Sequence, residues 1–108
     1  MPLFMSILTK KLELKANIIK ALSHPVRLYI VEKLDKGECC VCEFHDEVGG
    51  DFSMVSKHLT ILKKAGIIKS EKRGLKVFYK LKVPCINNFL SCIENIAIDN
   101  VKETMEIL

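Results

Sequence analysis

The stretch that decides the fold is residues 49–66, GGDFSMVSKHLTILKKAG. Two glycines form a tight turn, and Asp51 or Ser53 caps the helix that follows. We expect this helix to run to Ala65, because Gly66 then ends it. Apolar side chains recur along one face at helical spacing, so that face packs inward. They are Val55, Leu59 and Leu62. The stretch therefore predicts the second half of a helix-turn-helix.

The flanking sequence completes this arrangement. Residues 41–48 predict a short helix that ends at the two glycines. After Gly66 the hydrophobic period changes, and residues 67–71 and 76–81 predict two strands joined by a turn at Gly74. This order is that of a winged helix-turn-helix, in which the second helix enters the major groove and the hairpin lies along the phosphates. We therefore expect a mainly α fold with a β-hairpin wing.

Further helices are expected on both sides of this unit. Residues 8–22 carry apolar side chains at helical spacing, and Ser23-His24-Pro25 restarts the chain as a second helix with proline in its first turn. A long final helix carries an apolar stripe over residues 86–108. The first and last helices are too apolar to face water alone, so we expect them to form a homodimer interface. A two-fold dimer would pair two recognition helices on double-stranded operator DNA.

Charge and length narrow the class of protein. The net charge of +4 over 108 residues hides a basic segment, residues 53–82, in which nine lysines and arginines face one acidic residue, Glu71. Such a segment is typical of a surface that binds a polyanion. The alternative is that these lysines only form a solvated face. No stretch approaches the ~20 apolar residues that span a bilayer, and no signal peptide is recognisable. We expect a single domain over residues 1–108 of a cytoplasmic protein that binds no membrane.

A thiol cluster precedes the helix-turn-helix. It comprises Cys39, Cys40, Cys42 and, three residues later, His45, while Cys85 and Cys92 lie near the final helix. In a reducing compartment such cysteines are expected to be ligands or redox groups rather than a disulfide framework. Zinc, cadmium or lead could bind Cys40 and Cys42 together with His45 and one further cysteine.

Two other interpretations of these cysteines stay open. Oxidation of Cys40 or Cys42 with Cys85 or Cys92 would make the protein a redox switch. Alternatively the cysteines are small buried hydrophobes, which we favour for Cys39. The thioredoxin-like βαβ pattern of a dithiol oxidoreductase is missing around Cys40-Val41-Cys42, so we do not expect an enzyme.

The DNA contacts are expected on the helix after the turn and on the hairpin. The side chains nearest the base edges lie at the N-terminal end of that helix: Ser53, Met54, Ser56, Lys57 and His58. The phosphate contacts, which give affinity and register, are expected from Lys63, Lys64, Lys72, Arg73 and Lys76. Among these residues, we most expect Lys57 to contact DNA directly, whereas His58 could equally be partly buried.

Four segments carry a family likeness: residues 21–28 (ALSHPVRL), 53–59 (SMVSKHL), 62–68 (LKKAGII) and the Arg73-Gly74 hairpin. Together they closely resemble the ArsR/SmtB family of winged-helix repressors. The resemblance implies a homodimeric transcriptional repressor that leaves DNA when it binds a metal, metalloid or oxidant, with no obligatory cofactor.

Arsenic sensors of this family carry a Cys-Val-Cys pair at the start of the first helix of the helix-turn-helix, and Cys40-Val41-Cys42 matches that pair. They carry a third cysteine at the position where this chain has His45. The resemblance therefore favours arsenite or antimonite as the inducer, with Cys85 or Cys92 as the source of a third sulfur.

Overall fold

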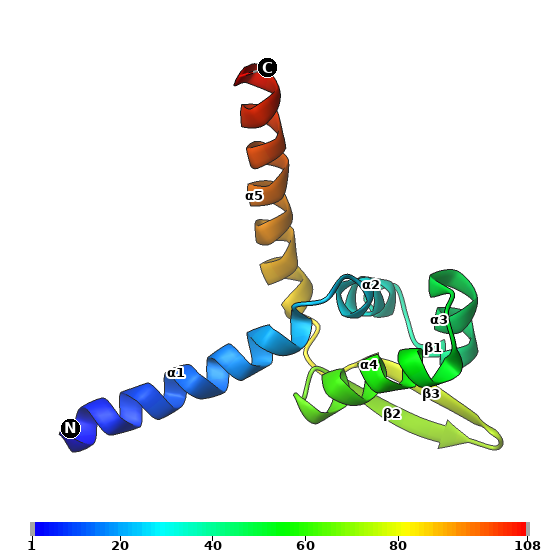
Figure 1. Cartoon of the computed structure of the whole chain (residues 1–108). Coiled ribbons are helices and arrows are strands. Elements are labelled where there is room, and N and C mark those ends of the chain that lie inside the picture. Colours follow the sequence, from blue (N-terminus) through cyan, green and yellow to red (C-terminus); the bar gives the residue numbers. More distant parts are fainter. Residues whose placement is uncertain (1, 108) are drawn as a thin grey trace.

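The computed structural model describes residues 2–107 and follows the predicted order of elements (Figure 1). The elements are α1 (Leu3–Leu22), α2 (Pro25–Leu34), β1 (Cys39–Cys40), α3 (Val41–Val48), α4 (Phe52–Lys64), β2 (Ile68–Arg73), β3 (Lys76–Leu81) and α5 (Ile86–Ile107). Leu108, the last residue of the predicted apolar stripe, lies outside the described residues. Across residues 2–107, no helix is both long enough and apolar enough to cross a membrane.

The core lies between α2, α3, α4 and the sheet. Its largest fully buried side chains are Phe44, Ile30, Leu59, Leu62, Ile68, Val31 and Val55. The predicted inward face of α4 is thus confirmed. Because α4 is held along this whole face, its opposite face has a fixed orientation toward solvent.

Helices α1 and α5 extend from this core as two long arms (Figure 1). The radius of gyration is 17.1 Å, compared with about 13 Å for a compact domain of this length. Within the described parts of the arms, the buried residues are Ala21, Leu22 and Leu90. Large apolar side chains elsewhere on the arms are exposed, for example Phe4 by 74% and Val101 by 59%. The arms therefore carry apolar surface that the chain itself does not cover.

The sheet is larger than the sequence predicts. Its order is β1-β3-β2, and β1 pairs antiparallel with β3 so that Cys39 lies opposite Tyr79 and Cys40 opposite Phe78. Two residues are too short a strand to show an alternating pattern, so β1 could not be predicted. Strand β2 begins one residue later and ends two residues later than expected. The cysteine pair therefore belongs to the same sheet as the wing.

Local capping sets where the helices of the central unit begin. Of the two predicted caps for α4, Asp51 fills this role, because its Oδ1 accepts hydrogen bonds from Met54 N at 2.8 Å and from Ser53 Oγ at 2.7 Å. These hydrogen bonds, that of Ser53 first, lower the pKa of Asp51. Helix α2 starts at Pro25, and His24 caps it by accepting a hydrogen bond from Val26 N at its Nδ1, at 3.1 Å.

Candidate DNA-binding surface and thiol cluster

The exposed face of α4 carries most of the residues that the sequence predicts to approach base edges. Ser53, Met54, Ser56 and Lys57 are all exposed. Thr60 lies one turn beyond Ser56, donates its hydroxyl to the Ser56 carbonyl oxygen at 2.9 Å, and is also exposed. Sequence reasoning missed Thr60, although its i+4 spacing from Ser56 places both on one face. This face offers hydroxyl, thioether and ammonium groups suited to reading a groove.

His58 does not belong to that face. Its side chain is buried, with its ring centroid 4.3 Å from that of His24 and its Nδ1 3.3 Å from Nη1 of Arg27. Because a guanidinium only donates, Nδ1 of His58 must accept, which requires the neutral imidazole. Burial first, and then the charges of His24, Arg27 and Lys57, lower the pKa of His58. The partly buried alternative therefore describes His58, which does not lie on the exposed face of α4.

The wing presents further cations around its turn. Lys72 and Lys76 are exposed on either side of the turn, and Leu75 at the tip is fully exposed. Lys64 is exposed at the end of α4, whereas Lys63 donates from Nζ to Ser70 Oγ on β2 at 2.7 Å. The predicted phosphate-binding lysines thus lie on α4 and on the adjacent hairpin.

Among residues 2–107, Arg73 is the one predicted phosphate contact with carboxylate partners. Its Nη1 and Nη2 donate to the two carboxylate oxygens of Glu38 at 2.5 and 2.8 Å, and Nη2 also donates to Glu71 at 3.0 Å. The guanidinium lies over the ring of Phe78, 4.8 Å from its centroid. The hydrogen bond from Arg73 lowers the pKa of Glu38, and both carboxylates raise the pKa of Arg73. Sequence reasoning missed Glu38, which is 35 residues away in the chain.

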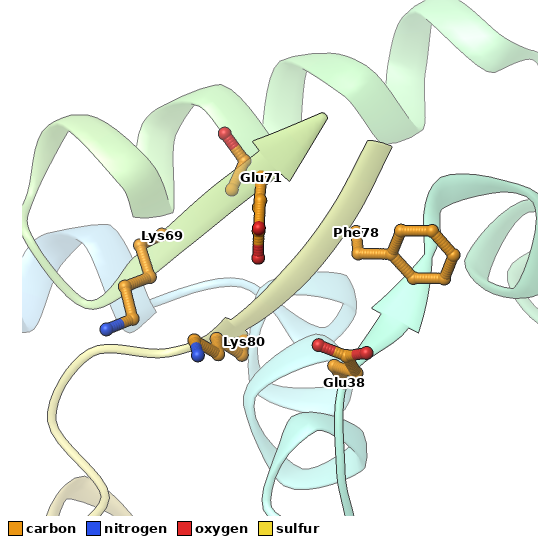
Figure 2. Close-up of a pocket in the computed structure, with 6 residues that line it drawn as sticks. Glu38, Lys69, Glu71, Phe78 and Lys80 are labelled. Carbon is orange, nitrogen blue, oxygen red and sulfur yellow. The ribbon is translucent and has the colours of Figure 1, made fainter. Parts of the chain in front are cut away.

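A small hollow of about 210 Å³ lies on this side of the wing. It is lined by Glu38, Lys69, Ser70, Glu71, Phe78 and Lys80. Figure 2 shows the lysine ammonium groups at one end of the hollow and Glu38 with Phe78 at the other. Because charges of both signs line it, the hollow does not select an anion or a cation by charge; two of its lining residues, Glu38 and Glu71, are the carboxylate partners of Arg73.

The thiols of the cluster lie in different environments. Cys39 and Cys40 form β1 and are buried, whereas Cys42 is exposed in the first turn of α3. Burial raises the pKa of Cys39, and its Sγ donates weakly to the Gly37 carbonyl oxygen at 3.7 Å. The interpretation of Cys39 as a buried hydrophobe fits this position.

Cys40 and Cys42 form a hydrogen-bonded pair at the start of α3. Cys40 is the N-cap residue, and its backbone N donates to Glu43 Oε2 at 2.7 Å within a capping box. Hydrogen bonds from the backbone N–H and then the thiol of Cys42 lower the pKa of Cys40, and the same thiol contact raises the pKa of Cys42. The lowered pKa of Cys40 favours its thiolate, which is the form that acts as a nucleophile and as a metal ligand.

The structure does not bring the other predicted ligands to this pair. The ring of His45 stacks on Phe52 with centroids 4.4 Å apart, and its Nδ1 is 3.9 Å from Asp46 Oδ1. Cys85 and Cys92 are exposed free thiols at the α5 arm, which Figure 1 places on the other side of α2 from α3. Within residues 2–107, no three or more His, Cys, Asp or Glu side chains are grouped to hold a metal ion. Among the described residues, the structure therefore brings two of the predicted sulfur ligands together, Cys40 and Cys42.

A helix-turn-helix with an exposed polar recognition face, followed by a basic hairpin, defines a winged helix-turn-helix DNA-binding protein. Comparison with known proteins identifies the same class. A family model described as "Bacterial regulatory protein, arsR family" matches residues 24–70. An uncharacterized HTH-type transcriptional regulator of Methanocaldococcus jannaschii, MJ1325, is 36% identical over 88 residues, which are 81% of this chain and 99% of that protein.

Two Mycobacterium tuberculosis proteins extend the comparison. The HTH-type transcriptional repressor SmtB is 39% identical over 70 residues, which are 65% of this chain but only 52% of that repressor, so the chain spans about half of that relative's length. The crystal structure of Rv0081 superposes with a TM-score of 0.77 at 28% identity, covering 86% of this chain and 94% of that one. This chain belongs to the ArsR family of DNA-binding transcriptional regulators. The expected fold is confirmed, as is the expectation of a regulator rather than an enzyme.

Proposed function

We propose that this protein is a cytoplasmic, homodimeric repressor that binds double-stranded operator DNA and releases it when a thiophilic metalloid or metal binds Cys40 and Cys42. Arsenite and antimonite are the favoured inducers, and zinc, cadmium and lead are alternatives. The whole of residues 1–108 acts as one domain in this proposal. The name of the repressor SmtB supports a repressing role.

The DNA-binding part of the proposal is supported by the exposed face of α4 and the wing beside it. Ser53, Met54, Ser56 and Lys57 would approach base edges. Lys63, Lys64, Lys72, Arg73 and Lys76 would contact phosphates.

The homodimer is supported by the two arms. Large apolar residues remain exposed along α1 and α5, including Leu3, Phe4, Ile96, Val101 and Met105. A soluble monomer rarely leaves so much contiguous apolar surface in water. A second copy would cover it symmetrically and would hold two α4 helices at a fixed spacing.

The observation that carries the sensing proposal is the hydrogen-bonded Cys40–Cys42 pair at the start of α3. Soft thiolates bind thiophilic ions in preference to hard cations. The pair fits such an ion as a two-sulfur donor, and a further donor must come from outside the group that one protomer assembles. Cys85 or Cys92, from the same or the second copy, is the proposed third sulfur, and His45 is the alternative donor for zinc.

The test compares DNA release by the wild type and by the Cys40→Ser/Cys42→Ser variant, measured as fluorescence anisotropy of a promoter duplex. Arsenite, antimonite, cadmium, zinc and lead are added in turn. We expect unchanged DNA affinity and no release for the double variant, with Cys39→Ala as the matched control that still responds. Release from the double variant by the same ion would exclude the pair as the sensor.

A thiol-redox repressor is the second candidate, and the lowered pKa of Cys40 beside a second thiol favours it. Peroxide would oxidise Cys40 and Cys42 to a disulfide, with loss of two protons and two electrons and formation of water. A disulfide that joins Cys40 or Cys42 to Cys85 or Cys92 would require α3 and α5 to approach one another. The intact mass after peroxide treatment, followed by peptide mapping, distinguishes these pairings.

A further inference from the structure

We propose that Glu38 competes with DNA phosphate for Arg73, and so acts as a positioning residue that sets how strongly the wing binds DNA. This inference rests on the proposed contact between the wing and DNA. It deepens that proposal by naming the group that regulates the contact.

The geometry of the pair is that of phosphate recognition. Two nitrogens of Arg73 face two oxygens of Glu38 at 2.5 and 2.8 Å. A phosphate group presents two oxygens to the same guanidinium fork, and bidentate binding of either anion uses the same N–H groups. The carboxylate of Glu38 therefore occupies the position that a DNA phosphate would take.

In the unbound chain, the edge of the fork formed by Nη1 and Nη2 is occupied by Glu38. Nη2 also donates to Glu71 at 3.0 Å, and the guanidinium face is covered by Phe78 at 4.8 Å from the ring centroid. A phosphate that binds Arg73 through Nη1 and Nη2 must displace Glu38. Displacement is feasible because both side chains of the Arg73–Glu38 pair are partly open to solvent, by 43% and 38%, where an ion pair contributes little to stability.

Glu38 lies where a change at the thiol pair would reach it. It directly precedes β1, two residues before Cys40, and Cys40 is opposite Phe78 in the sheet. Cys40 therefore lies two residues from Glu38 in the chain and opposite Phe78, the residue whose ring lies against the Arg73 guanidinium. A ligand or disulfide that shifts β1 would move Glu38 relative to Arg73 and change the competition.

The experiment is a double-mutant cycle on DNA affinity, with Glu38→Gln, Arg73→Gln and the combined variant. The probe is a fluorescein-labelled duplex of random sequence, about 30 base pairs long to accommodate two half-sites, at low salt and with fully reduced protein. We expect Glu38→Gln to tighten binding roughly fivefold, because two such pairs are removed per dimer. In the Arg73→Gln background the same change should have less than a twofold effect. The control Glu32→Gln, which removes an equal charge from an exposed position on α2, should leave affinity within twofold.

The outcomes separate this inference from the proposed function. If Arg73→Gln binds as tightly as the wild type, Arg73 does not contact DNA, and the proposed role of this wing residue fails together with the inference. If Arg73→Gln weakens binding but Glu38→Gln has no effect, or has the same effect in both backgrounds, the competition is overturned while the wing contact stands. Urea unfolding of each variant confirms that the measured affinities belong to folded protein.

Discussion

Neutralising the two lysines beside the wing turn should flatten the salt dependence of DNA binding. Lys72 and Lys76 are exposed, so replacement by glutamine removes a phosphate contact without breaking an internal ion pair. Each lost phosphate contact lowers the slope of log affinity against log salt by about 0.9. The proposed dimer carries four of these lysines, so the Lys72→Gln/Lys76→Gln variant should have a slope shallower by about 3.6.

This difference is large enough to measure directly. Between roughly 50 and 200 mM salt, the wild type should lose about 150-fold more affinity than the variant. The assay is fluorescence anisotropy of a labelled duplex over a salt series. The matched control is Lys10→Gln/Lys11→Gln, which removes the same charge from exposed positions on α1 and should keep the wild-type slope. Equal slopes for the wing variant and the wild type would remove the wing from the DNA interface.

Three further predictions concern stability and assembly. Because His58 has a lowered pKa in the folded chain, the unfolded chain binds its proton more readily, so the free energy of unfolding should decrease as the pH falls below about 6.5. Urea unfolding at several pH values should show that the free energy of unfolding falls less at low pH for His58→Leu than for the wild type. Asp51→Ala removes the cap of α4 and should lower the free energy of unfolding by about 1 kcal/mol in the same assay. Asp51→Asn should retain most of the stabilisation by the cap. Val101→Asp places a charge on the exposed apolar face of α5 and should dissociate the dimer in analytical ultracentrifugation.

Each of these has a clear contrary result. An identical pH dependence for His58→Leu would mean that another group causes the acid effect. A fully stable Asp51→Ala would show that tertiary packing alone holds the start of α4. A Val101→Asp protein that sediments like the wild type would exclude this face of α5 from a dimer interface.

Periodicity and turn residues were sufficient to predict the helix-turn-helix, because each signal is local. The paired glycines, the cap at Asp51 and the apolar spacing of α4 act within a few residues of one another. The wing was predictable for the same reason, since its hairpin turns at Gly74, which has a φ of +62°. These features depend on backbone sterics and short-range hydrogen bonds, which the sequence displays directly.

The features that sequence reasoning missed depend on contacts between distant residues. Strand β1 exists because Cys39 and Cys40 find partners on β3, about 40 residues later. The Arg73–Glu38 pair spans 35 residues, and His58 is buried because α4 packs against Arg27 and His24. The position of His58 in the helical pattern of α4 did not show whether it contacts DNA or is buried. Its burial depends on Arg27 and His24, which lie in and just before α2.

If the thiol pair is the sensor, as proposed, the pairing of β1 with β3 gives a physical reason for its position. A ligand changes DNA affinity only if it binds the DNA-competent and incompetent conformations with different affinities. A binding group on a surface helix remote from the wing could bind its ion with the same affinity in both conformations. Cys40 instead lies in the sheet that carries the wing, opposite Phe78 and near Glu38. Any ligand that requires Cys40 and Cys42 to move apart or together must also act on β1, so its binding energy becomes sensitive to the position of the wing.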